Sequence, residues 1–308
     1  MTSGSSILVA NGRDQEIVEF DPDGASGRRT GRAGDGPCEF RNLSAIAVMP
    51  GGLIAARDSH IGQLRICPVG GGPSRTLLLP GRTFDGLWAR GDTLFVVATT
   101  SDSVLALRVV FQPSGAETID TLTVSPPSEW RAALDGAARS TLKAMVPDGS
   151  VLIAATDTFF AIAKAGPGRT PARRFIRDDR PPLVLSADEV AERQAELENT
   201  LRRTGRPVPA GGIGSPPGPV TRPWFAGGRH LAVDSLGRVW ALPNSTASRP
   251  PALELYSAEG SLTARFAVPA STRGLRLDGP TITLYGAGED DTGWVKVYPL
   301  PGGGEPHG

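Results

Sequence analysis

The chain has 308 residues, 32 of them basic and 32 acidic, so its formal net charge is zero and no positive excess points to nucleic acid. Its 39 glycines, 28 prolines and 6% aromatic residues are typical of short strands that tight turns connect around an aliphatic core. No run approaches the roughly 20 apolar residues of a membrane span, and the first six residues lack the charged and apolar regions of a signal peptide.

The first set of predicted strands lacks one member. Ile7–Ala10, Glu16–Phe20 and Arg28–Arg32 predict the second, third and fourth strands of a small sheet, and no first strand precedes them. A connector with the sequence Gly-Asp-Gly-Pro-Cys-Glu-Phe follows over residues 34–40. Its glycines and proline favour a turn that leads to the next set of strands.

The next set is complete and defines a repeat. It comprises four predicted strands, Ser44–Val48, Leu53–Ala56, Gln63–Cys67 and Arg75–Leu79. A turn glycine precedes Leu53–Ala56, and turn glycines precede comparable segments at residues 93–98, 151–155, 239–242 and 281–285. With two insertions set aside, the period is about 40 residues, which is typical of four-stranded propeller blades.

The chain holds two cysteines, Cys38 in the connector and Cys67 at the end of a predicted strand. Two cysteines are too few for a disulfide scaffold. Because both could fall in one blade, they could form a single bridge, or they could remain as two partly buried thiols. The sequence leaves both alternatives open.

Two segments interrupt the repeat. Residues 123–140 predict a short capped helix. Residues 178–222 form a larger insertion, in which Ser186 and Glu189 fit a capping box before a helix that runs to Arg203. The Gly- and Pro-rich residues 209–223 then predict a loop. This insertion is either a decoration packed on a propeller face or a lid or partner-binding element.

The last two sets complete the fold prediction. One has four strands, His230–Asp234, Val239–Leu242, Ala252–Tyr256 and Ser261–Val268, and the final set has three, within residues 273–299. We therefore predict one all-β domain over residues 1–308, a six-bladed β-propeller with four-stranded blades, incomplete first and last blades and a helical insertion at about 178–222. Because open sheet edges are a liability, we also expect the native chain to begin upstream of Met1.

The sequence resembles the six-bladed β-propellers of the NHL-repeat type. The connector at residues 34–40 is similar to the family's Gly-x-Gly-Pro-Gly-Glu-Phe, with Cys38 in place of a glycine. Residues 231–240, Leu-Ala-Val-Asp-Ser-Leu-Gly-Arg-Val-Trp, resemble its Leu-x-Val-Asp-x-x-Gly-Arg-Leu-Trp pattern. The resemblance implies a bacterial protein that is periplasmic or lipid-anchored if an upstream signal precedes this chain, and soluble and cytoplasmic otherwise. It implies no assigned activity.

The sequence contains few candidate catalytic, metal-binding or ligand-binding residues. The three histidines show no zinc-ligand spacing, and no nucleophile elbow, P-loop or dinucleotide fingerprint occurs, so no catalytic residue and no cofactor are predicted. The acidic run at residues 289–291 could hold Ca²⁺, although such a run is more often a solvated turn. Loop and inner-strand positions near a channel or face supply the candidate binding residues, which are Asp58, His60, Asp85, Trp224, Arg229, His230 and Asp234.

Three function classes fit this pattern. We favour a non-enzymatic binding module, a monomer that contacts a protein, peptide or glycan, because catalytic motifs are absent and an insertion is present. The alternative is a metal-dependent lactonase or lyase-like hydrolase, which would need convergent ligands such as Asp85 and Asp234 at the channel. RNA binding, known for some NHL-type domains, is disfavoured by the balanced charge.

Overall fold

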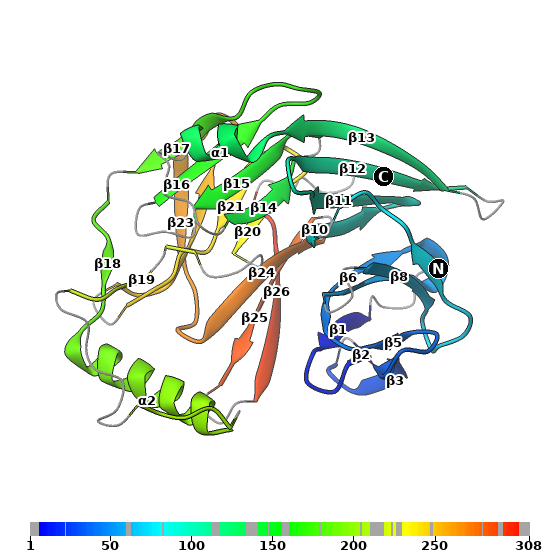
Figure 1. Ribbon diagram of the computed structural model, residues 1–308, viewed down its shortest axis with the longest axis horizontal. Helices are drawn as coiled ribbons and strands as arrows, with labels where there is room; N and C mark the ends of the chain where they lie inside the picture. The colour runs from blue at the N-terminus through cyan, green and yellow to red at the C-terminus, as the bar shows by residue number, and fades with distance from the viewer. Residues whose placement is uncertain are drawn as a thin grey trace. The chain divides into compact units, whose positions relative to one another are not determined.

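The computed structural model describes residues 6–21, 23–59, 63–81, 83–112, 117–133, 141–146, 148–155, 160–178, 180–203, 205–209, 219–222, 224–225, 230–246, 249–278, 280–288 and 292–301. Its strands build six sheets of three or four strands each, and the fold is a six-bladed β-propeller, as predicted (Figure 1). The chain divides into two compact units, the first comprising Met1–Trp130, Lys143–Val151 and Ala165–Ala172 and the second the rest.

Three of the sheets lie in the first unit, and all of them are antiparallel. The first has three strands, β1 (Ile7–Asn11), β2 (Glu16–Phe20) and β3 (Ser26–Thr30). The second has four, β6 (Leu43–Met49), β7 (Leu53–Asp58), β8 (Gln63–Pro68) and β9 (Arg75–Leu77), with a 3-10 turn at Pro50–Gly52. The third also has four, β10 (Thr83–Arg90), β11 (Thr93–Thr99), β12 (Val104–Phe111) and β13 (Glu117–Ser125).

The chain continues through α1 (Pro127–Ala133) into the fourth sheet, whose strands are β14 (Thr141–Met145), β15 (Val151–Ala155), β16 (Phe160–Ala165) and β17 (Arg173–Asp178). The insertion follows as β18 (Leu183–Val184), α2 (Ala187–Arg203) and β19 (Thr221–Arg222). The fifth sheet comprises β20 (Leu231–Val233), β21 (Val239–Ala241), β22 (Ala252–Tyr256) and β23 (Leu262–Ala267). The last has three strands, β24 (Thr272–Asp278), β25 (Thr281–Ala287) and β26 (Gly293–Pro299).

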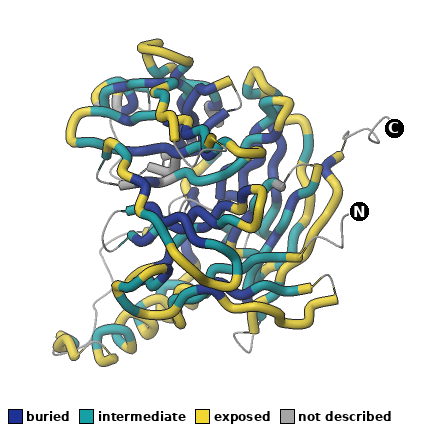
Figure 2. Tube along the Cα trace, turned by 90° about the vertical axis from the view of Figure 1, so that its right-hand side faces the viewer, coloured by how far each residue is buried: buried dark blue, intermediate teal, exposed yellow. Residues whose placement is uncertain are grey.

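Small and branched aliphatic side chains fill the core within each unit, as the low aromatic content predicts. In the first unit, Ala47, Leu64, Val96 and Leu107 belong to one buried cluster. In the second unit, a cluster around Trp240 joins β21, β22, β24 and β25. Buried residues therefore lie along the strands, and α2 has none, as the colours of Figure 2 show. Strand residues are buried because the sheets within each unit pack face to face, whereas α2 lies outside these sheets.

One predicted strand is wrong in its bounds. Residues 28–32 do not form one strand, because β3 ends at Thr30 and a two-residue strand, β4 (Arg32–Ala33), pairs in parallel with β5 (Glu39–Phe40). Gly31 separates them with φ 88, in the left-handed region that favours glycine. The segments at the two ends of the connector therefore pair with each other before the second blade begins.

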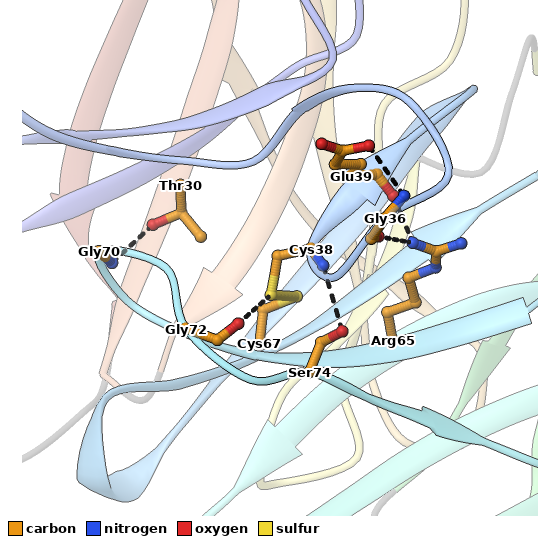
Figure 3. Close-up of a disulfide and its surroundings, with 9 residues drawn as sticks. All are labelled: Thr30, Gly36, Cys38, Glu39, Arg65, Cys67, Gly70, Gly72 and Ser74. Atoms are coloured by element: carbon orange, nitrogen blue, oxygen red, sulfur yellow. Dashed lines mark hydrogen bonds between the residues drawn. A yellow bond between two sulfur atoms is a disulfide. The ribbon is translucent and has the colours of Figure 1, made fainter.

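The two cysteines form a disulfide, with Cα atoms 5.8 Å apart (Figure 3). Cys38 takes φ 53, which a glycine adopts at far lower cost, so this cysteine keeps the backbone shape of the glycine that the resemblance places here. The N–H of Cys38 donates to Oγ of Ser74 at 3.2 Å. The bridge thus ties the connector to the end of β8, which offsets the cost of the unusual backbone.

Charged groups fix the rest of the connector. Arg65 is buried on β8, and its Nη1 donates to the carbonyl oxygens of Gly36 and Glu39, both at 2.6 Å (Figure 3). Glu39 accepts from the N–H of Gly36 at 2.8 Å and from Nε of Arg32 at 2.6 Å. These two donors, the Gly36 N–H above all, lower the pKa of Glu39 from its ordinary value.

Replacing the disulfide tests its contribution to stability. The double variant Cys38→Gly/Cys67→Ala should lose about 3–4 kcal/mol of unfolding free energy in a urea titration, because a loop of 29 residues is no longer closed. Glycine accepts φ 53 without strain, so this variant removes the bridge and leaves the backbone at position 38 unstrained. Cys38→Ala/Cys67→Ala should lose about 1 kcal/mol more. Equal stabilities of the two variants would contradict the backbone argument, and an unchanged Cys38→Gly/Cys67→Ala variant would contradict the bridge.

Candidate functional site

The structure describes only some of the seven predicted binding residues. His60 and Arg229 lie outside the described residues, as does the predicted calcium run at 289–291. Asp85 lies in β10 at a bulge between Phe84 and Gly86, and only its backbone is described. The structure therefore places the side chains of four of the seven, Asp58, Trp224, His230 and Asp234.

Asp58 ends β7 and is fully buried. Its Oδ2 accepts a hydrogen bond from the N–H of Arg41 at 2.8 Å, and its Oδ1 accepts one from the N–H of Asn42 at 3.1 Å. A buried carboxylate needs such donors, because its charge loses its water on burial. In this geometry Asp58 holds the segment between the connector and β6.

Asp234 organises the hairpin between β20 and β21. Its Oδ1 accepts from the N–H groups of Leu236 and Arg238, both at 3.0 Å. Its Oδ2 accepts from Nε of Arg238 at 2.6 Å and from Nε1 of the buried Trp240 at 3.1 Å. Four donors thus converge on one carboxylate, which gives a physical reason for the spacing of Asp, Arg and Trp in residues 234–240.

Trp224 lies at the base of the insertion. We call this base, which comprises the described residues 180–185, 219–222 and 224–225, the stem. The stem begins as a ladder between β18 and β19 with Leu183 opposite Arg222, and the N–H of Leu185 donates to the carbonyl of Val220 at 2.9 Å. The chain then runs beside the loop after β21, where Asn244 N–H donates to the carbonyl of Trp224 at 2.7 Å. The stem is therefore hydrogen-bonded to the fifth blade.

A buried ion pair fastens the stem to this blade. Nη1 of Arg180 lies 2.9 and 3.1 Å from the two carboxylate oxygens of Glu254, in the middle of β22. The two side chains are only 5% and 2% exposed. The hydroxyl of Tyr256 donates to Oε2 of Glu254 at 2.7 Å, and Nε of Arg265 on β23 donates to Oε1 at 3.1 Å. We call Arg180, Glu254, Tyr256 and Arg265 the latch.

Trp224 completes the contact between the stem and the latch. The Arg180 guanidinium lies 5.1 Å from the centroid of its ring, and the Arg249 guanidinium lies 4.5 Å from it. Arg249 is also 3.7 Å from Glu254. Cations within about 6 Å of an indole face are attracted to it. The predicted residue Trp224 therefore sits where positive charge and the single carboxylate of Glu254 meet.

His230 precedes β20 and is also buried, with 8% of its surface exposed. Its carbonyl accepts from the N–H of Leu242 at 2.8 Å, and its Nδ1 has no hydrogen-bond partner within the described part of the chain. Burial above all, with a smaller effect of the Arg222 charge, lowers the pKa of His230, while backbone hydrogen bonds of Leu242 and Arg273 oppose the shift. The imidazole is thus neutral at neutral pH.

This arrangement binds the stem to the blade, and His230 is a separate buried, neutral imidazole before β20. Where side chains are described, no three His, Cys, Asp or Glu residues gather closely enough to hold a metal ion. Sequence reasoning named Trp224 and His230 as candidates, and it did not name Arg180 or Glu254. One signal was present, because pairing the predicted strands at 252–256 and 261–268 sets Glu254 opposite Arg265.

Helix α2 follows β18 and lies below β18 and β19 in the view of Figure 1. The predicted capping box is confirmed, because the N–H of Ser186 donates to Oε2 of Glu189 at 2.8 Å and the N–H of Glu189 donates to Oγ of Ser186 at 3.2 Å. No residue of the helix is buried, and Leu197 is 48% exposed. A shallow pocket of about 410 Å³ runs along it, lined by Glu192, Ala195, Glu196, Asn199, Thr200 and Arg203.

Removing the charge of Glu254 tests the latch. Glu254→Gln should cost about 3–5 kcal/mol of unfolding free energy, measured by urea titration with tryptophan fluorescence, because Arg180 stays buried without its counter-charge. Glu254→Gln/Arg180→Met should recover most of that loss. The matched control Glu259→Gln, on an exposed turn of the same blade, should stay within about 0.5 kcal/mol of the wild type. A double variant no more stable than Glu254→Gln would contradict the latch.

Comparison with known proteins shows the fold and no family. No family model matches the sequence. No curated protein matches it either. Among solved structures, a gluconolactonase from Xanthomonas campestris is 12% identical with a TM-score of 0.51, over 96% of this chain and 82% of the other. A puromycin-hydrolysing peptidase from Mycobacterium tuberculosis is 14% identical with a TM-score of 0.52, over 98% of this chain and 42% of the other. Such low identities extend the likeness to the propeller fold and no further.

Proposed function

We propose that this protein is a non-enzymatic binding propeller of the NHL-repeat type, which recognises a protein or peptide partner through α2. The observation that carries the proposal is the contrast between stem and helix. The stem is fastened by a buried ion pair, whereas the 17-residue helix that it holds buries no residue. Most helices in proteins owe their stability to a packed face, so a helix that buries no residue gains stability when a partner covers it.

The disulfide favours an oxidising compartment as the place where the protein acts. Bridges such as Cys38–Cys67 form and persist in oxidising compartments and are rare in a reducing cytosol. We therefore propose an extracytoplasmic site of action, in the periplasm or at a lipid anchor. None of the described helices is long and apolar enough to cross a membrane. The proposed module acts as a monomer and needs no cofactor.

A second candidate function is a metal-dependent lactonase or lyase-like hydrolase. The observation that favours it is His230, a buried and neutral imidazole whose Nδ1 is not engaged by the described residues. Neutral imidazole can bind a metal ion or accept a proton. The two proposals differ in what they require of the purified protein, since only the second requires bound metal and turnover.

Photo-crosslinking tests the binding proposal. A benzoylphenylalanine in place of Leu197 on α2 should give a discrete crosslinked product in the cells that produce the protein. The matched control replaces Leu236, which is even more exposed but lies on the turn after β20. The Leu236 position should give no such product. Equal products at both positions, or none at Leu197, would contradict recognition by α2.

A deletion and an assay complete the test. Joining Leu185 to Val220 through Asn-Gly removes the helix and keeps their backbone hydrogen bond, so the unfolding midpoint should not change while the crosslinked partner is lost. Purified wild-type protein should also leave lactones unhydrolysed in the presence of Ca²⁺. Turnover that a chelator and His230→Gln both abolish would establish the second candidate and overturn the first.

A further inference from the structure

One face of α2 carries the residues that line its shallow pocket. They follow one another at intervals of three and one residues, so they form a single row along the helix. We call this row the stripe, and its members are Glu192, Ala195, Glu196, Asn199, Thr200 and Arg203. Thr200 is partly buried and the others are exposed. The stripe is therefore the side of α2 on which a second helix can pack.

The charges of the stripe differ in sign between its two ends. Glu192 and Glu196 lie in its first half, and Arg203 is its last residue. The two glutamates are four positions apart, where like charges on a helix repel each other. Within the described part of the chain no hydrogen bond or ion pair engages these three side chains, whereas the nearby Arg202 is paired with Glu198 at 3.1 Å. Both ends of the stripe can therefore pair with a charge from outside the helix.

This order of charges is complementary to itself when the helix direction is reversed. A two-fold axis at the middle of the stripe sets Glu192 of each copy opposite Arg203 of the other. These two residues lie about three helical turns apart, and hence on the same line along the helix. Between them Ala195, Asn199 and Thr200 have short side chains, which lets two helix axes approach closely. Such a contact uses the same surface on both copies, as two-fold dimers require.

We propose that two copies of this protein associate through the stripes of their α2 helices, which pack antiparallel in a two-fold dimer. The contact is small and polar, so the dimer is weak and reversible. It covers α2 until the partner of the function proposed above displaces one copy, and the protein then recognises that partner as a monomer. The displacement rests on the proposed function, whereas the dimer itself does not.

Sedimentation velocity of the purified full-length protein over a concentration series tests the dimer without any partner. The wild type should shift reversibly from monomer to dimer as its concentration rises. Glu192→Arg and Arg203→Glu should each weaken the dimer roughly tenfold, because both contacts between opposite charges become contacts between like charges. The matched control Glu259→Arg, the same charge change on an exposed turn of the fifth blade, should dimerise like the wild type.

A mixture of the two variants tests the antiparallel arrangement. When a Glu192→Arg copy pairs with an Arg203→Glu copy, both contacts join opposite charges again, so an equimolar mixture should dimerise like the wild type. Both positions are exposed, so the unfolding midpoints of the variants should match that of the wild type. A wild type that stays monomeric, single variants that dimerise like it, or a mixture that does not recover would overturn the proposal. Such a failure leaves the crosslinking test of the partner unaffected, because sedimentation involves no partner.

Discussion

The buried contact between Arg180 and Glu254 is the interaction on which the arrangement of the second unit depends. An ion pair that is nearly inaccessible to water is costly unless other groups also bond its atoms, and here Tyr256 and Arg265 donate to the carboxylate oxygens of Glu254. The contact joins the start of the insertion to the middle of β22. Because the stem is fixed in this way, α2 is held in place although none of its residues is buried, which leaves its side chains available for recognition.

Two further buried carboxylates are used in the same manner. Asp58 holds backbone N–H groups after the connector, and Asp234 holds the hairpin that contains Arg238 and Trp240. Hairpins of a propeller must be fixed if successive blades are to keep their register. The two acidic candidates whose side chains are described, Asp58 and Asp234, are therefore engaged by the fold.

The sequence predicted the blades because strand alternation and turn glycines are local signals. Strand pairing could have set Glu254 opposite Arg265, but it could not have shown that Glu254 is buried, since Leu-Glu-Leu in a strand is the alternation of a solvent-facing glutamate. The burial comes with Arg180, which lies far away in the sequence. The sequence left the pairing of Cys38 and Cys67 open because bridging depends on a distance that only the fold provides. It predicted Trp224 and His230 as candidates but not their surroundings, which come from loops distant in the chain.

The central claim is that a rigid stem presents a helix without buried residues, and hydrogen–deuterium exchange of the wild-type protein tests it most directly. The amides of Leu185 and Asn244, which bind the carbonyls of Val220 and Trp224, should exchange as slowly as the amides of β22. Amides in the middle of α2 should exchange at least about tenfold faster, because the helix can open without disturbing buried contacts. Stem amides that exchange as fast as those of α2, or α2 amides as slow as those of β22, would contradict the account.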